Sequence, residues 1–383
     1  MDGLAPRGDI APDFQTLHEV VRAARRALPD SIWGYLIGGA DTETTLLRNR
    51  HALDSVAFRP RVLRDVSAVD PRHRFLGQEL RLPVLLAPIG GLESMEPGGA
   101  ATVVRAAHEA RVPAMVSSVT LPGLEEAAAA APAFRIFQLY VRGDDAWIDD
   151  HGARAIAAGY AAFCFTVDTA VYSRRERDIA GRFDKPWRRR VTGHEFQAGL
   201  TWRQIERFRA RHDIPVILKG IATAEDAAIA CDHGVDAVYV SNHGGRQLDH
   251  GRGAIDALPE VVEAVRGRAR VIVDGGICRG ADVVKAMALG ADLVGIGRLY
   301  AYGLAADGVR GIARVLSLLE EEIRGVMGLL GIAGWDQLDP SLLHRGAAPM
   351  VPPHVFSAFP LLSSADVPAM RDPGPMADHP AGA

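Results

Sequence analysis

Eight short apolar runs alternate with helix-like stretches through the middle of the chain. Each run has the length of a β-strand and is apolar along nearly all of it, as expected of a strand that is buried on both faces. This alternation indicates parallel βα units, and eight units are the number that closes a TIM barrel. The sequence therefore predicts an α/β fold built on a (β/α)8 barrel. The eight runs are residues 83–88, 114–118, 135–140, 162–168, 216–220, 237–242, 270–276 and 293–298.

Helical patterns flank the predicted barrel on both sides. Apolar residues recur there with the spacing of an amphipathic helix. We expect an N-terminal helical extension, C-terminal helices, and a single domain over residues 1–345. The helical stretches are residues 14–28, 32–37 and 43–53 before the barrel and 308–330 after it.

The C-terminal tail is rich in proline. Residues 346–383 hold 8 of the 23 prolines. Proline lacks a backbone N–H and interrupts helices and strands, so this tail should be irregular. It also contains an apolar stretch over 355–362, which could dock on the barrel or on a neighbouring subunit.

One βα connection of the predicted barrel is longer than the others. The fourth and fifth runs start 54 residues apart, at positions 162 and 216, and the extra length falls at about 177–201. A long connection at the catalytic face usually forms a lid or a binding loop, and a solvated surface excursion is the alternative. The segment is basic through Arg182, Lys185, Arg188, Arg189 and Arg190.

Charge and cysteine content exclude several classes of protein. The net charge of −4 shows no excess of positive charge of the kind that binds nucleic acid or an anionic membrane. No apolar run reaches about 18 residues, and the N-terminus lacks the apolar core of a secretory signal. Cys164, Cys231 and Cys278 are widely separated, which indicates a reducing compartment and no zinc site. We expect a cytoplasmic protein without a membrane segment or a metal.

Chemistry in a TIM barrel is found where the strands end and the βα loops begin. His243 is the only histidine at a predicted strand end, and the ordinary pKa of histidine, near neutrality, suits a general base. Asp168 ends the fourth strand and could orient the imidazole and stabilise its charged form. A histidine that caps a strand or fills the core is the alternative.

Three cationic side chains accompany these groups. Arg175 and Arg246 could clamp the carboxylate of a substrate, although Arg175 could equally belong to a surface ion pair. Lys219 lies at a buried strand end, where an unpaired ammonium is costly and needs an electron-rich partner. An anionic cofactor ring would provide that partner.

The turns after the last two strands are typical of a phosphate site. An Asp-Gly-Gly turn follows the seventh strand (274–276), and Gly-x-Gly-Arg closes the eighth (295–298). Barrels commonly bind phosphate at these two loops. Glycine lets backbone N–H groups approach the anion, and arginine adds a charged fork of donors. The ligand is therefore expected to carry a phosphate.

Taken together, these motifs resemble the FMN-dependent 2-hydroxy acid oxidase and dehydrogenase family, which includes glycolate oxidase, lactate oxidase and mandelate dehydrogenase. The resemblance covers residues 17–338 and implies a TIM barrel that binds FMN. It also implies oxidation of an (S)-2-hydroxy acid to the 2-oxo acid, with oxygen or another acceptor taking the electrons. The motifs are FRPRVLRDVS (58–67), FQLYV (137–141), TVDTAVYSRRERD (166–178), LKGIATAEDA (218–227), SNHGGRQLD (241–249), VDGGICRGADVVKA (273–286) and GIGR (295–298).

The resemblance assigns roles to single residues. It makes His243 the base, Asp168 its partner, and the two arginines the carboxylate clamp. Tyr35 and Tyr140 correspond to tyrosines that contact the substrate, Tyr140 near the substrate hydroxyl. Lys219 corresponds to the lysine that stabilises the reduced flavin. His243 would take either the α-proton or the hydroxyl proton of the substrate.

Further residues correspond to the flavin contacts of the family. Cys278 stands where relatives commonly carry an arginine that binds the phosphate, so Arg279 or Arg298 must take over that contact. The other expected contacts are Pro88, Ile89, Gly90, Ser117, Gln138, Thr166, Lys219, Ser241, Asp274, Gly275, Gly276 and Gly297.

Three positions bear on the size of the substrate. Gly90 stands where short-chain enzymes often carry alanine, and Val119 where glycolate oxidases carry tryptophan, while Tyr172 could fill part of the room gained. We expect a bulky or aromatic, mandelate-like acid, with lactate as a smaller candidate, and a homotetramer. A flavin- or phosphate-binding isomerase and a non-catalytic binding protein are the alternatives. The pairing of Arg175 and Arg246 around His243 favours oxidation.

Overall fold

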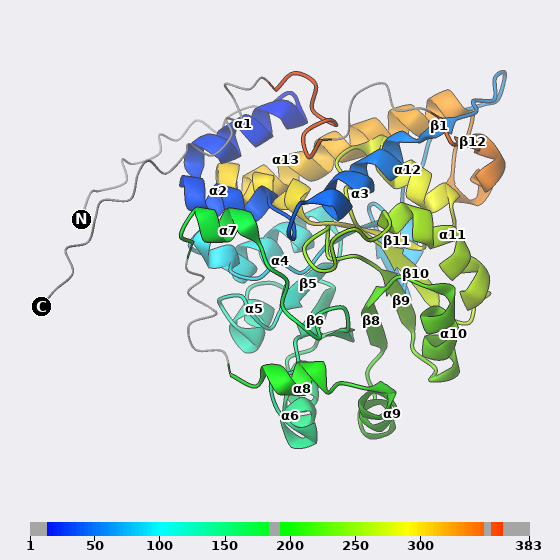
Figure 1. Cartoon of the computed structure of the whole chain (residues 1–383). Coiled ribbons are helices and arrows are strands. Elements are labelled where there is room, and N and C mark those ends of the chain that lie inside the picture. Colours follow the sequence, from blue (N-terminus) through cyan, green and yellow to red (C-terminus); the bar gives the residue numbers. More distant parts are fainter. Residues whose placement is uncertain (1–13, 184–191, 348–353, 363–383) are drawn as a thin grey trace, which may run out of the picture.

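The structure is a computed structural model that describes residues 14–183, 192–347 and 354–362. Eight parallel strands form a closed barrel at the centre of the molecule (Figure 1). The strands follow one another around the barrel in chain order, and β11 pairs back to β4. The predicted α/β barrel is therefore confirmed, with all eight predicted strands present. They are β4 Val84–Leu86, β5 Ala114–Ser117, β6 Arg135–Leu139, β7 Ala162–Thr166, β8 Val216–Ile221, β9 Ala237–Val240, β10 Arg270–Val273 and β11 Leu293–Ile296.

The barrel strands are apolar because both of their faces are buried. Every residue of β5, β6, β7 and β9 is buried. Side chains such as Met115, Ile136 and Tyr239 point inward and form a core inside the barrel. Their neighbours Val116 and Phe137 belong to a second core, between the strands and the surrounding helices. This two-sided burial explains the continuous apolar runs in the sequence.

A β-hairpin fills the amino end of the barrel. Strands β2 (His73–Phe75) and β3 (Gln78–Leu80) pair antiparallel across a two-residue turn. Phe75 and Leu80 are 1% and 2% exposed and pack inside the barrel against the residues that begin its strands. The hairpin was not predicted. Because it closes the amino end, the carboxyl ends of the strands are the open side of the barrel.

Helices surround the barrel and connect its strands (Figure 1). The N-terminal extension folds into three helices, as predicted, and α1 packs along α13. Helix α13 contains a break at Asp307 and Gly308, so the predicted helix 308–330 is its second half. The helices are α1 Leu17–Ala27, α2 Asp30–Ile37, α3 Thr44–Asp54, α4 Gly99–Ala110, α5 Leu124–Ala129, α6 Asp145–Ala157, α9 Trp202–Arg211, α10 Ala224–Asp232, α11 Ala254–Val265, α12 Gly280–Ala288 and α13 Arg298–Leu330.

The long connection between β7 and β8 carries two short helices, α7 (Glu176–Ala180) and α8 (His194–Ala198). Of its basic residues, Arg182 is exposed, whereas Lys185 and Arg188, Arg189 and Arg190 lie outside the described residues. Outside the barrel, β1 (Val56–Phe58), which follows α3, pairs antiparallel with β12 (Leu343–Arg345).

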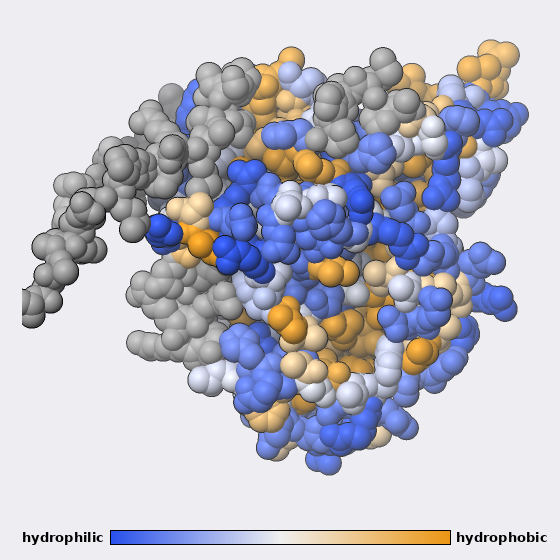
Figure 2. All heavy atoms as spheres, in the orientation of Figure 1, coloured by the Kyte–Doolittle hydropathy of each residue, from blue (hydrophilic) through white to orange (hydrophobic). Residues whose placement is uncertain are grey.

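The surface is mixed in character. On the face shown in Figure 2, hydrophilic residues cover most of the molecule and hydrophobic residues show between them. Among the described helices, none combines the length and the apolar character needed to cross a membrane.

Candidate active site

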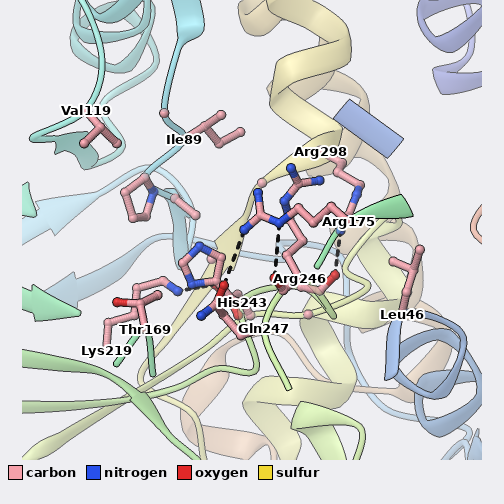
Figure 3. A pocket seen from close by; sticks show the side chains of 18 of the residues that line it. Leu46, Ile89, Val119, Thr169, Arg175, Lys219, His243, Arg246, Gln247 and Arg298 are labelled. Atoms are coloured by element: carbon pink, nitrogen blue, oxygen red, sulfur yellow. Dashed lines mark hydrogen bonds and ion pairs between the residues drawn. The ribbon is translucent and has the colours of Figure 1, made fainter. Parts of the chain in front are cut away.

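A cavity of about 510 Å³ opens at the carboxyl ends of the barrel strands (Figure 3). Its volume lies within the range of cofactor and small-molecule pockets, about 300–1,000 Å³. Most of the residues singled out from the sequence line it together. These are Tyr35, Pro88, Ile89, Gly90, Tyr140, Arg175, Lys219, His243, Arg246, Asp274, Gly275, Gly276, Gly297 and Arg298.

The His243 imidazole is held between Asp168 and Tyr140. Its Nδ1 lies 3.2 Å from Asp168 Oδ1, and its Nε2 lies 3.1 Å from the Tyr140 hydroxyl. Burial lowers the pKa of His243 below its ordinary value, and the Asp168 carboxylate offsets this shift only in part. Burial raises the pKa of Tyr140, so its hydroxyl keeps the proton. A neutral imidazole that donates from Nδ1 and accepts at Nε2 fits both contacts and can take up a proton.

The Asp168 carboxyl group is largely shielded from solvent, with 12% of its side chain exposed, and its surroundings favour the ionised form. Burial alone would raise the pKa of Asp168, but the charge and hydrogen bond of His243, together with the charge of Lys219, hold this pKa below its ordinary value. The backbone beside it is glycine for a steric reason: a Cβ on Gly220 (φ +113°) would lie 2.6 Å from the Asp168 Cβ. The close approach of β8 therefore fixes the carboxylate behind the imidazole.

The turn after β9 aims His243 at the cavity. His243 has a left-handed backbone (φ +60°), which is strained for a residue with a side chain. Its N–H donates to Ser241 Oγ at 3.1 Å, and Gly245 N–H donates to Asn242 Oδ1 at 3.1 Å. These hydrogen bonds stabilise the turn, in which the chain changes direction at His243 after the end of β9.

Three guanidinium groups, those of the buried Arg175 and of the half-buried Arg246 and Arg298, gather on one side of the cavity (Figure 3). None of them forms an ion pair with a carboxylate of the described residues. Burial, and then repulsion from Arg246, lower the pKa of Arg175 and bring that of Arg298 to about 10. Burying charges without a counterion is costly. The cluster is therefore suited to binding an anion.

The partners of these arginines are mostly backbone carbonyls. Arg246 Nη1 donates to the carbonyls of Tyr35 and Gly38, at 2.6 and 2.8 Å, while its Nη2 is buried without a partner among the described residues. Arg298 donates to the carbonyls of Leu36, Gly38 and Gly244 at 2.7–3.0 Å. Neutral carbonyls orient the guanidinium groups but leave their charge uncompensated.

Two tyrosine rings cover the first two arginines. The guanidinium carbon of Arg246 lies 4.7 Å from the centre of the Tyr35 ring, and that of Arg175 lies 4.5 Å from the Tyr172 ring. The Tyr35 hydroxyl donates to the Gly90 carbonyl at 3.0 Å. The Tyr172 ring therefore lies against the Arg175 guanidinium group.

A chain of hydrogen bonds holds Lys219 at the floor of the cavity. Its Nζ donates to Ser241 Oγ at 2.9 Å, and Ser241 donates to Asp274 Oδ1 at 2.6 Å. Lys219 Nζ lies 3.7 Å from Asp274 Oδ2, and the lysine is only 3% exposed. The ammonium is fixed in place and lines the cavity, where an electron-rich ring can contact it.

The residues expected to contact FMN fit a flat, hydrogen-bonding ring with a phosphate. Gln138 donates from Nε2 to Thr166 Oγ1 at 2.8 Å, and its buried Oε1 has no partner among the described residues. This acceptor suits an N–H of a heterocycle, but Gln138 is buried and does not line the cavity. The same is true of Ser117, Thr166 and Ser241. A Cβ on Gly297, next to Arg298, would meet no atom within 4 Å, which leaves room for an anion. Ser117 is buried beside these strand ends, with its Oγ 3.4 Å from Val119 N.

Arg279 is a correction to the sequence-based expectation. Its side chain does not line the cavity. Nη2 lies 2.5 Å from Glu322 Oε1, and Nη1 donates to the Ala358 carbonyl at 3.0 Å. These two partners keep the Arg279 guanidinium out of the cavity, whereas Arg298 lines it, as does Arg50, whose Nη1 donates to the Gly276 carbonyl at 3.0 Å. Burial raises the pKa of the neighbouring Cys278 to about 11, so this cavity residue is a neutral thiol.

Several cavity residues were not found from the sequence. Arg50 is one of them, with both terminal nitrogens 2.8 Å from the carboxylate of Asp282. Another is Thr169, whose buried hydroxyl has no partner among the described residues. The only sequence feature that pointed to Thr169 is its position directly after Asp168. The others lie outside the barrel strands or on the loops around its mouth, and include Leu36, Met95, Arg142, His194, Tyr302 and Val355. The described residues contain no cluster of side chains suited to a metal ion.

Comparisons with known proteins agree with this geometry. A family model described as FMN-dependent dehydrogenase matches residues 24–345. The 4-hydroxymandelate oxidase of Amycolatopsis orientalis is 41% identical over 342 residues, which are 83% of this chain and 95% of that protein. An L-lactate oxidase of a Nostoc species is 37% identical over 355 residues, 86% of this chain and 97% of that protein. A crystal structure of mandelate oxidase with 3,3-difluoro-2-hydroxy-3-phenylpropionic acid superposes with a TM-score of 0.81 at 42% identity, covering 87% of this chain and 100% of that one.

Proposed function

The chain belongs to the FMN-dependent dehydrogenase family, and we propose that within it the protein oxidises (S)-2-hydroxy acids with a bulky, aromatic side chain of the mandelate type. Its membership makes it an enzyme that oxidises 2-hydroxy acids with FMN. The observation that carries the finer proposal is the cavity wall made by Gly90 and Val119, two small residues that line the cavity together with Tyr140 and His243. A small wall at this place leaves room for a ring on the α-carbon.

The residues of the cavity divide the work between binding and proton transfer. Arg175 and Arg246 bind the substrate carboxylate, because both line the cavity with His243 and neither has a carboxylate partner among the described residues. His243 Nε2 takes the proton, from either the α-carbon or the hydroxyl. Asp168 then stabilises the imidazolium, as a carboxylate does for a catalytic histidine. FMN supplies the two-electron redox chemistry when it is bound.

The remaining residues position the cofactor and the substrate hydroxyl. Tyr140 and Tyr35 lie on the substrate side, where Tyr140 donates to His243. Lys219 would place its positive charge against the flavin ring and stabilise the reduced form. The residues proposed to hold the ring and its phosphate are Pro88, Ile89, Gly90, Ser117, Gln138, Thr166, Ser241, Asp274, Gly275, Gly276, Gly297 and Arg298.

Anaerobic reduction of the holoenzyme tests the proposal. The flavin absorbance is followed after mixing with (S)-mandelate, (R)-mandelate, (S)-lactate or glycolate, and oxygen is then admitted. We expect (S)-mandelate to bleach the flavin fastest and (R)-mandelate to leave it oxidised. Rapid return of colour with oxygen would identify an oxidase. Fastest bleaching by glycolate would refute the aromatic preference, and no bleaching by any of the acids would refute the reaction.

Two further proposals concern the assembly and the compartment. All three cysteines are buried free thiols, which supports a reducing, cytoplasmic environment. We also propose a homotetramer. Light scattering by the holoenzyme measures the assembly, and cell fractionation followed by activity assay measures the location.

A further inference from the structure

The wall of the cavity includes a residue from beyond the family match. The match ends at residue 345, yet Val355 lines the cavity. Val355 belongs to a segment of residues 354–362 near the C-terminus, drawn in red beside α1 and α13 in Figure 1. We call this segment the clasp.

Two aromatic side chains anchor the clasp to the N-terminal helices. Phe356 is 8% exposed and stacks on Trp33 of α2, with ring centres 5.9 Å apart and planes 3° from parallel. Phe359 is 1% exposed and meets His18 of α1 edge-on, at 5.8 Å between ring centres. Both rings are part of the main hydrophobic core. The clasp is therefore packed against the body of the protein.

Arginine side chains hold the backbone of the clasp. Arg279 donates to the Ala358 carbonyl at 3.0 Å, and Arg22 donates to the Leu361 carbonyl. Arg279 directly follows Cys278, which lines the cavity. The arginine next to the phosphate loop thus binds the clasp.

The clasp lies at the phosphate end of the cavity. Trp33, which stacks on Phe356, also packs against Tyr302 at 5.7 Å between ring centres. Tyr302 follows Arg298 by one helical turn, and both line the cavity. Cys278 and Tyr302 are close enough to Arg298 to influence its pKa, and Val355 adds an apolar side chain from the clasp to the lining of the same cavity. An apolar side chain excludes water, and attraction between an arginine and a phosphate is stronger when water is excluded.

From these contacts we propose that the clasp closes the phosphate end of the cavity and retains FMN, with Val355 as a residue that positions the phosphate. The proposal rests on FMN as the cofactor and on Arg298 as the residue that meets its phosphate. It assigns a cofactor-binding role to a segment that the family match does not include.

Charge placed at position 355 tests the proposal. Val355→Glu, Val355→Lys and Val355→Gln are made in the full chain, and dissociation constants for FMN and for riboflavin are measured from flavin fluorescence. Glutamate should weaken FMN binding at least tenfold relative to glutamine by repelling the phosphate, whereas lysine should not weaken it. Riboflavin, which has no phosphate, should distinguish the three variants by less than threefold. The difference between glutamate and lysine should shrink as salt is added.

A matched control and a truncation complete the test. Leu361→Glu puts the same charge on the clasp at an exposed position and should change FMN affinity by less than threefold. A chain that ends after Ala347 should release FMN at least tenfold faster, with its folding checked by circular dichroism without flavin. Equal FMN affinities of Val355→Glu and Val355→Lys would overturn the proposal, as would unchanged release from a folded truncated chain. Failure of the unmodified protein to bind FMN would instead overturn the cofactor assignment.

Discussion

His243 and Asp168 come from loops after different strands, β9 and β7, and meet with Nδ1 and Oδ1 3.2 Å apart. The strand between them, β8, carries Gly220, whose lack of a side chain lets the carboxylate sit this close. The contact with Asp168 holds the Nδ1 edge of the imidazole, and Nε2 then faces Tyr140. The geometry of the barrel thus sets which nitrogen is available for proton transfer.

His243→Ala should abolish flavin reduction while FMN stays bound. A general base typically contributes about 10²–10⁴-fold, and we expect the rate constant of flavin reduction by (S)-mandelate to fall by at least 10²-fold. Stopped-flow absorbance under anaerobic conditions measures this rate. The exposed His250, seven positions later, provides the control: His250→Ala should reduce flavin at nearly the original rate. A loss of less than tenfold in His243→Ala would remove His243 from the role of base.

The pH profile of kcat/KM should fall on its acid side below pH 6.5. Burial lowers the pKa of His243 from the ordinary value of 6.5, and only the neutral imidazole can accept the proton. The Asp168 carboxylate raises this pKa, so Asp168→Asn should move the acid limb to still lower pH while it lowers the maximum rate. An acid limb at or above pH 6.5 in the unmodified enzyme, or an upward movement in Asp168→Asn, would contradict this assignment.

Arg246→Lys should weaken the use of the substrate, whereas Arg298→Lys should weaken the binding of FMN. A hydrogen bond to a charged group is worth about 1.5–3 kcal/mol, and an ammonium cannot reproduce the fork of a guanidinium. Arg246→Lys should therefore lower kcat/KM for (S)-mandelate by about 10- to 100-fold and leave FMN affinity within threefold. Arg298→Lys should weaken FMN more than riboflavin and leave the KM of the FMN-saturated enzyme unchanged. Similar effects of both variants on FMN and on substrate would show that the two anions are not bound separately.

Val119→Trp should reverse the preference for mandelate over glycolate. Burying about 100 Å² of a phenyl ring at about 25 cal/mol per Å² gives about 2.5 kcal/mol, or up to about 70-fold in kcat/KM. Tryptophan at position 119 would occupy that space. Val171 also lines the cavity but is 79% exposed, so Val171→Trp should keep the original order. If the unmodified enzyme already prefers glycolate, Tyr172 is the obstruction and the spacious-pocket interpretation is wrong.

The barrel was predictable because its signal is local. Each strand, such as β7 with its five buried residues, is apolar along most of its length, and the chain order of the runs is also their order around the barrel. Once the strands were placed, the residues after them had to gather at one end. For this reason His243, Arg246 and Lys219 could be assigned to one cavity before any contact was known.

The features that escaped prediction depend on contacts between distant parts of the chain. Arg279 is turned away by Glu322 and by Ala358, and no local pattern links those positions. The hairpin over residues 73–80 has strands of only three residues, too short for an alternating pattern to stand out. Val355 reaches the cavity only because Phe356 and its neighbours pack on helices at the other end of the sequence.

Phe75 and Leu80 complete the packed core inside the barrel, so the described residues leave no passage through its amino end. The hairpin that carries them covers the amino end. Ligands that reach the described part of the barrel must therefore enter and leave through the cavity that His243 lines. The incoming acid and the outgoing 2-oxo acid then share a single passage, and a product that lingers there blocks the next substrate. Turnover in such an enzyme depends on the rate of product release as well as on the rate of proton transfer.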